Sequence, residues 1–234
     1  MTPSKIQDHI KFTDHDHRYV NMNTGDDYQS VTTLIHKYVP KFDANRISAA
    51  VAKKRGLPQH VILKEWEDNK NAACEKGTFV HKVIEDYFEE GLVTDGFETL
   101  LEKIAADPII SLKGRSEEIA YSDECMIAGQ VDRRNLIGNT LNIIDWKTNK
   151  EIKRTGFRGE KLKGALAHLD NCNFNIYSLQ LSIYALLLCK MYGYNIGRLY
   201  LVWIRGQEFE RIECPFLHEE ARGILNRRFL MVNP

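Results

Sequence analysis

The stretch CMIAGQVDRRNLIGNTLNIIDWK, residues 125–147, decides the fold of this chain. Its residue pattern has a period of two, which is typical of strands, and turn-forming residues 137–139 divide it into strands expected at 125–135 and 140–146. A shorter strand, expected at 117–121, precedes it across a second turn at 122–124. We therefore predict an antiparallel meander of three strands.

Segments whose apolar residues recur at helical spacing precede and follow this meander in the sequence. Apolar residues of 71–90 recur at helical spacing until Gly91, and the long apolar segment 176–192 ends at Gly193. The first thirty residues are polar, and we interpret them as one or two weakly determined strands. Further helices are expected at 30–38, 43–54, 58–66, 97–106 and 219–230, and further strands at 198–204 and 208–212.

This order of elements predicts an α/β fold with a central mixed β-sheet flanked by helices. We place an N-terminal strand and helical subdomain at residues 1–70, packed on a core of residues 71–234. The chain has 234 residues, of which 43% are hydrophobic and 27% charged. This composition fits a globular domain and excludes a disordered tail protein.

Membrane and compartment signals are also readable. The longest charge-free run, residues 171–189, is interrupted by polar residues, so its apolar part is short of the roughly 20 residues that cross a bilayer. No apolar stretch follows the polar N-terminus, so we expect neither a membrane span nor a signal peptide. The five cysteines form no Cys-x-x-Cys pair, and we interpret them as reduced thiols of a cytoplasmic protein.

The charge of the chain is balanced in total but not locally. Basic and acidic residues number 32 each, so a strongly basic nucleic-acid-binding protein is not the first expectation. Residues 147–163, however, hold seven basic and two acidic residues, and residues 85–102 hold seven acidic and no basic ones. A neutral protein with such blocks can still hold a polyanion on one face.

The residues that suggest chemistry are Asp132, Asp145 and Lys147. Neighbouring antiparallel strands could bring the two carboxylates together, with Lys147 on the same face as Asp145 because strand side chains alternate. Two carboxylates repel each other unless a cation lies between them, and oxygen ligands suit Mg²⁺ or Mn²⁺. We expect removal of either aspartate to relieve this repulsion and to improve folding slightly.

Structural alternatives to a site remain open at this point. Asp-x-Lys occurs by chance in many proteins, and an aspartate at a strand end is usually a solvated turn residue. His81 and Glu85 lie four apart on one helical face and could be a surface pair. Glu117 could add a carboxylate or could be a solvated strand end. Residues 14–17, Asp-His-Asp-His, resemble a metal site in composition, but we interpret them as a solvated segment.

Four motifs together resemble the PD-(D/E)XK nuclease superfamily. Within it, they are similar to the RecB-like branch, which includes phage-encoded exonucleases and the mitochondrial genome maintenance exonuclease. The motifs follow the family's order over residues 77–184. They are Gly77-x-x-x-His81 in a helix, Gly129-x-x-Asp132 and Asp145-x-Lys147 in strands, and Gln180-x-x-x-Tyr184 in a helix.

This resemblance implies a restriction-endonuclease-like core and a set of residue roles. The metal ligands would be His81, Asp132, Asp145 and the main-chain carbonyl of Trp146. The catalytic residues would be Asp132, Asp145, Lys147, Gln180 and Tyr184, with Glu85 and Glu117 as accessory carboxylates. Substrate phosphates would contact Lys150, Lys153, Arg154 and Arg158. Phe157 and Phe174 could stack on bases, although core packing is the commoner fate of an aromatic side chain.

The function implied is that of a Mg²⁺-dependent deoxyribonuclease, in which Mn²⁺ can substitute. We expect an exonuclease acting on DNA ends or single strands, in host cytoplasm if the protein is phage-encoded, in DNA recombination, repair or degradation. The cysteines lack the grouping of family members that hold an iron–sulfur cluster, so no cluster is expected. Alternatives are a catalytically inactive DNA-binding module, a structure- or sequence-specific endonuclease, and an RNA nuclease.

Overall fold

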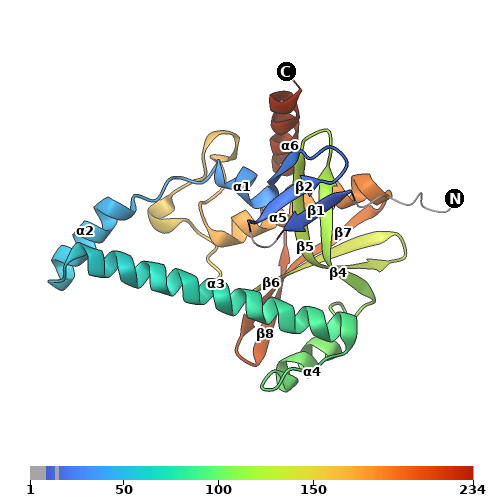
Figure 1. The fold of residues 1–234 in the computed structure, drawn as a ribbon, viewed down its shortest axis with the longest axis horizontal. Coiled ribbons are helices and arrows are strands. Elements are labelled where there is room, and N and C mark those ends of the chain that lie inside the picture. Colours follow the sequence, from blue (N-terminus) through green and yellow to red (C-terminus); the bar gives the residue numbers. More distant parts are fainter. Residues whose placement is uncertain (1–8, 14–15, 234) are drawn as a thin grey trace.

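A computed structural model describes residues 9–13 and 16–233 (Figure 1). Its central sheet has eight strands, seven of which follow one another in the order β1-β2-β3-β5-β6-β7-β8, while β4 pairs with β5. The strands are β1 (Ile10–Thr13), β2 (Arg18–Asn21), β3 (Asp27–Ser30), β4 (Gly114–Ser122), β5 (Ile127–Ile137), β6 (Thr140–Lys147), β7 (Asn195–Arg205) and β8 (Glu208–Cys214).

The expected meander is present as β4, β5 and β6. Each of its two pairs is antiparallel, whereas β6 runs parallel to β7 and β3 runs parallel to β5, which makes the sheet mixed. The β3 to β5 pairing joins the N-terminal strands to the rest of the sheet. The Asp-His-Asp-His segment interpreted from the sequence lies partly outside the described residues.

The helices begin and end close to the residues that the sequence indicates. The side chain of Ser30 accepts a hydrogen bond from the N–H of Thr33, and that of Asp43 accepts one from Arg46, as N-caps do. Gly193 adopts the left-handed conformation at the end of α5. The helices are α1 (Val31–His36), α2 (Ala44–Arg55), α3 (Gln59–Glu90), α4 (Glu98–Ala106), α5 (Asn173–Tyr192) and α6 (His218–Val232).

Helix α3 corrects one expectation. The sequence predicts two helices, at 58–66 and 71–90, but the structure has one helix of 32 residues. The intervening residues 67–70 contain no glycine or proline, so nothing ends the helix there. The boundary that we place at residue 70 therefore falls inside α3, and the division into two parts stays a prediction.

Two hydrophobic clusters cover the two faces of the sheet. The larger contains residues of α1, α5 and α6, and the other contains Val80, Val83 and Ile84 of α3 with residues of α4. The chain is therefore an α/β fold with a mixed sheet flanked by helices. Helix α5 is long and apolar enough to cross a membrane, but 56% of its most apolar window is buried in the fold. It is the central helix of the larger cluster.

Candidate metal centre

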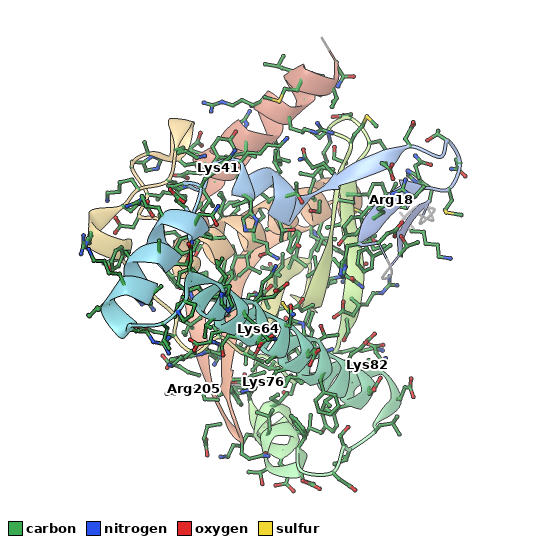
Figure 2. The ribbon with its side chains drawn as sticks, turned by 60° about the vertical axis from the view of Figure 1, so that its left-hand side comes forward. Arg18, Lys41, Lys64, Lys76, Lys82 and Arg205 are labelled. Carbon is green, nitrogen blue, oxygen red and sulfur yellow. The ribbon has the colours of Figure 1, made fainter. Side chains whose placement is uncertain are left out.

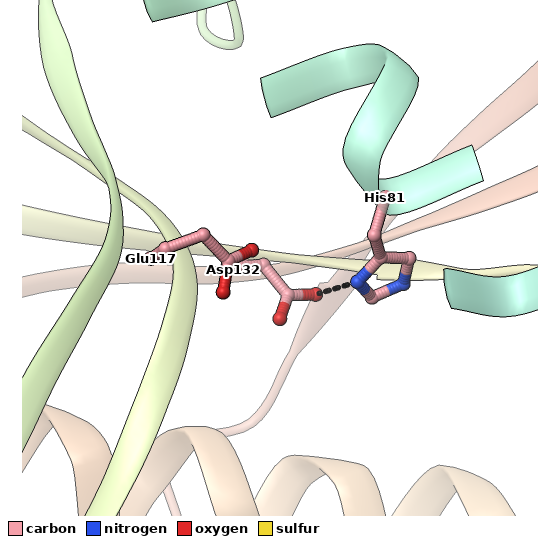
Figure 3. A group of neighbouring side chains, drawn as sticks. All are labelled: His81, Glu117 and Asp132. Atoms are coloured by element: carbon pink, nitrogen blue, oxygen red, sulfur yellow. Dashed lines mark ion pairs between the residues drawn. The ribbon is translucent and has the colours of Figure 1, made fainter. Parts of the chain in front are cut away.

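His81, Glu117 and Asp132 come together from three elements (Figure 3). Helix α3 supplies His81, β4 supplies Glu117 and β5 supplies Asp132. One ligand atom of each residue lies within 4.8 Å of the others, and each residue is partly buried. An imidazole and two carboxylates form a donor set that suits a divalent cation. The geometry thus fits a metal ion, without specifying which one.

The pairing of β4 with β5 sets two of these ligands opposite each other. Ser116 pairs with Arg133 and Glu118 with Val131, so Glu117 faces Asp132 across the two strands. Glu117 has a φ of 52°, in the left-handed region that residues other than glycine rarely adopt. Such strain costs on the order of 1–3 kcal/mol and is concentrated at functional sites. The amide of Gln130 donates to the Glu117 carbonyl at 3.4 Å.

The backbone of Trp146 holds the other two ligands. Its N–H donates to Asp132 Oδ2 at 2.8 Å, and its carbonyl accepts from His81 Nε2 at 2.9 Å. Because a carbonyl can only accept, Nε2 carries the proton, and in the neutral ring Nδ1 then has a free lone pair. Nδ1 lies 3.6 Å from Asp132 Oδ2. The tautomer is therefore the one in which Nδ1 can bind a metal inside the cluster.

Asp145 and Lys147 form an ion pair beside the cluster. The Asp145 carboxylate is 3% exposed, and its Oδ2 lies 2.5 Å from Lys147 Nζ. Burial raises the pKa of Asp145 to about 6; the Lys147 charge opposes this increase and the Asp132 charge adds to it. Burial would lower the pKa of Lys147, but the charges of Asp145 and Asp132 overcome it and hold the lysine protonated.

The buried Asp145 Oδ2 is held by the Lys147 ammonium, which lies 2.5 Å away, and no other described group donates to this oxygen. Buried acceptors in native proteins are normally satisfied by a donor or an ion, and the ammonium fills that role here. The charges of Asp132 and His81 also act on Asp145, which places this carboxylate next to the three-residue cluster.

Lys147 has a further neighbour that sequence reasoning missed. Its Nζ lies 4.8 Å from the ring centre of Tyr177, whose hydroxyl donates to Asn149 Oδ1 at 2.9 Å. Tyr177 is three residues before Gln180, on the same face of α5. That spacing is the signal which could have found it. An aromatic face near an ammonium stabilises its charge and fixes its direction.

Gln180 and Tyr184 contact each other. The Gln180 amide donates to the Tyr184 hydroxyl at 3.1 Å. Tyr184 is only 3% exposed, and its ring packs so closely on Gly129 that a Cβ there would lie 2.4 Å from ring atom Cε1. Burial raises the pKa of Tyr184 well above its usual value. The structure therefore gives Tyr184 a packing position between α5 and β5, over Gly129, which lies three residues before Asp132 on the same strand.

The two accessory carboxylates have different surroundings. Glu117 belongs to the cluster, whereas Glu85 does not and lies 3.2 Å from Lys82 Nζ. Lys82 also pairs with Asp86 at 2.8 Å. The helical face that carries His81 thus brings no second carboxylate to the cluster. Of these two carboxylates, the one that reaches the cluster is Glu117 of β4.

The cationic segment 147–163 follows β6 and carries the residues that we expect to contact phosphates. Lys150, Lys153, Arg154 and Arg158 are all exposed. Arg154 lies over the ring of Phe174, which is buried, whereas Phe157 is 77% exposed. Of the two aromatics considered for stacking, Phe174 therefore packs in the core. Phe157 remains accessible.

No protein-family profile and no curated protein matches the sequence. The fold is similar to the crystal structure of SSO0001, with 14% identity, 88% of this chain and 76% of that chain covered, and a TM-score of 0.37. It is also similar to a candidate exonuclease from Eubacterium rectale, with 9% identity, coverages of 88% and 79%, and a TM-score of 0.38.

Proposed function

We propose that this protein is a metal-dependent nuclease that hydrolyses phosphodiester bonds of DNA. The observation that carries the proposal is the cluster of His81, Glu117 and Asp132 beside the Asp145–Lys147 ion pair. A purely structural sheet gains nothing from gathering three carboxylates, because their repulsion is costly. A bound cation would offset the repulsion between these carboxylates, and an anionic substrate would pair with Lys147.

The residues divide into two roles. His81, Glu117 and Asp132 would hold the metal, with Asp145 as a further carboxylate donor. Mg²⁺, or Mn²⁺ in its place, would lower the pKa of a bound water and offset charge on a phosphate. Lys147 would hold that water in place and stabilise the negative charge that develops on the phosphate oxygens.

Two positioning contacts support these roles. Tyr177 and Asp145 fix the Lys147 ammonium from two sides. The Trp146 backbone fixes both His81 and Asp132, so the carbonyl that the resemblance assigns to the metal is here a hydrogen-bond acceptor. Trp146 would thus act on the metal through His81. Lys150, Lys153, Arg154 and Arg158 would contact the phosphates.

We propose digestion from DNA ends, as the resemblance implies. The test uses 5′- and 3′-labelled linear DNA, nicked circles, closed circles and labelled linear RNA, each with Mg²⁺ and with chelator, and Asp132→Ala as the inactive control. Loss of linear DNA alone is expected. Linearisation of closed circles would replace the exonuclease by an endonuclease, cleavage restricted to an RNA strand would indicate an RNA nuclease, and binding without any cleavage would indicate an inactive module.

A further inference from the structure

Phe42 and Trp66 form an aromatic pair far from the metal centre. Their ring centres are 5.7 Å apart, at an angle of 55°. Phe42 is 66% exposed, and neither ring belongs to the hydrophobic clusters found among the described residues. Trp66 is partly buried, so the pair presents one exposed and one half-covered ring. Aromatic side chains at the surface outside any core cluster can mark a binding surface.

The pair sits on a separate helical hairpin, which we call the arm and define as residues 41–66. Helix α2 and the first part of α3 make the arm, which extends away from the sheet at the left of Figure 1. Ala52 and Ile62 are buried inside it, and Arg55 pairs with Glu65 at 2.6 Å. The arm therefore has its own small interior and presents the rings from an ordered support.

A solvated length of helix joins the arm to the metal centre. All ten residues 67–76 of α3 are exposed. A helix surrounded by water gains nothing from packing, so this length is a spacer. At 1.5 Å per residue, Trp66 lies about 22 Å from His81 along the axis, and at 100° per residue the two are only about 60° apart around it. Lys70, Cys74 and Gly77 lie between them on that side.

The spacer and the arm carry unpaired positive charge. Among the described residues, five lysines of 41–76 have no ion-pair partner, against two glutamates. Asp43, Glu65 and Asp68 are each held by a basic side chain. Figure 2 shows Lys41 and Lys76 in this part of the molecule. The unpaired lysines are Lys41, Lys53, Lys54, Lys70 and Lys76, and the unpaired glutamates are Glu67 and Glu75.

We propose that the Phe42–Trp66 pair is a stacking platform for the bases of single-stranded DNA. This inference rests on the proposed function and names its substrate form. Accessible aromatic rings flanked by lysines are how proteins hold single strands without sequence preference. In a duplex the base faces are covered by their neighbours, so duplex DNA cannot use the rings. A stacked strand with 3.4 Å per nucleotide spans the interval to His81 with about six nucleotides.

The test measures binding without cleavage. Fluorescence anisotropy of a labelled 20-nucleotide oligothymidine in chelator is compared for the intact protein, Phe42→Ala and Trp66→Ala. Each alanine variant is expected to lose about tenfold in affinity, since stacking on one ring contributes roughly 1–3 kcal/mol per base. Trp66→Phe keeps a ring and is expected to retain affinity, which separates stacking from a folding defect.

An abasic oligomer of the same length provides the decisive comparison. It has the phosphates but no bases, so Trp66→Ala and the intact protein should bind it equally. Phe229→Ala, a change of an exposed aromatic on α6, is the matched control and should alter neither affinity. The platform is refuted if the alanine variants bind oligothymidine like the intact protein, or weaken the abasic oligomer equally, or if a closed hairpin duplex shows the same loss.

This result is independent of catalysis. In an Asp132→Ala background, which cannot cleave DNA, Trp66→Ala should weaken oligothymidine binding in chelator by the same factor, because Trp66 lies about 22 Å from His81 along α3. If the intact protein never cleaves DNA but its binding depends on the rings, the nuclease proposal fails and the platform stands. If it cleaves DNA while binding ignores the rings, the platform fails alone.

Discussion

Gly129 and Tyr184 are in contact across the interface of β5 and α5. A Cβ added at Gly129 would lie 2.4 Å from Tyr184 Cε1 and 2.9 Å from its hydroxyl, closer than van der Waals contact allows. The glycine lies three residues before Asp132 on β5. The motif glycine is therefore explained by the ring that covers it.

Gly129→Ala should destabilise the protein by about 1–3 kcal/mol, as overpacking of a core does. Urea unfolding followed by circular dichroism measures this change. Gly223→Ala is the control, because its Cβ would meet nothing and alanine favours a helix over glycine. Tyr184→Leu should recover part of the loss in the double variant. An unchanged midpoint in Gly129→Ala would contradict the packing described.

At position 117 we expect the glycine variant to be more stable than the alanine variant, which is the reverse of their usual order in a strand. At a φ of 52°, alanine keeps the strain of the left-handed conformation and glycine does not. Glu117→Gly should therefore be about 1–2 kcal/mol more stable than Glu117→Ala in chelator. Both should bind Mn²⁺ less tightly than the intact protein by calorimetry. Equal stability of the two variants would show that the strain is absent.

Asp145→Ala should destabilise the protein, in contrast to the slight gain expected from the sequence. The sequence suggests repulsion between carboxylates, but the structure pairs Asp145 with Lys147, whose side chain is only 16% exposed. Removing one partner of a buried pair costs roughly 3 kcal/mol, because the other charge is left unpaired. Thermal unfolding in chelator measures it. The double variant Asp145→Ala with Lys147→Met should recover stability, and a single variant as stable as the intact protein would argue against the pair.

Lys147→Ala should lose turnover while it keeps metal affinity, since an ammonium supplies no ligand. Lys147→Arg should rescue poorly, because a planar guanidinium does not replace a compact ammonium held between Asp145 and Tyr177. Initial rates on linear DNA and Mn²⁺ calorimetry give the two readouts. Loss of metal affinity in both variants would show that the role assigned to Lys147 is wrong.

The cysteines should differ in reactivity. Cys74 is exposed on the spacer of α3, whereas Cys214 is buried and its burial raises the pKa of its thiol to about 11. At pH 8 such a thiol is about one-thousandth ionised, and the thiolate is the reactive form. Iodoacetamide should therefore label Cys74 first, as peptide mass spectrometry can show. Labelling of Cys214 at a similar rate would mean that this side of the core opens readily.

Much of the fold was predictable because its signals are local. The Asp43 cap, the Gly193 stop and the turns of the meander each depend on a few adjacent residues. The break between residues 66 and 71 was wrong because a polar stretch looks like a loop, although its residues all favour or tolerate a helix. Whether a polar helix persists depends on what holds its ends, and that is tertiary information.

The metal centre was predictable in part for the same reason. The sequence predicts Asp132, Asp145 and Lys147 because they lie on adjacent strands, and the resemblance predicts His81. The position of the Glu117 carboxylate in the cluster depends on a left-handed backbone conformation and on the register of β4 against β5, and no residue pattern specifies either. Tyr177 and the hydrogen bonds of Trp146 depend on how α5 and α3 are placed against β6. These placements arise from packing over the whole sheet.

The geometry of helix α3 is that of a lever. The helix is packed in the core from Val80 onward, while residues 67–76, which connect Trp66 to the core, are exposed to solvent. If the helix tilts by about 5° at Val80, Trp66 moves by roughly 2 Å at a distance of about 21 Å, whereas His81, one residue from Val80, barely moves. Trp66 can thus follow a moving nucleic-acid strand, while the metal-ligating atom of His81 keeps its distance from Asp132 and Glu117.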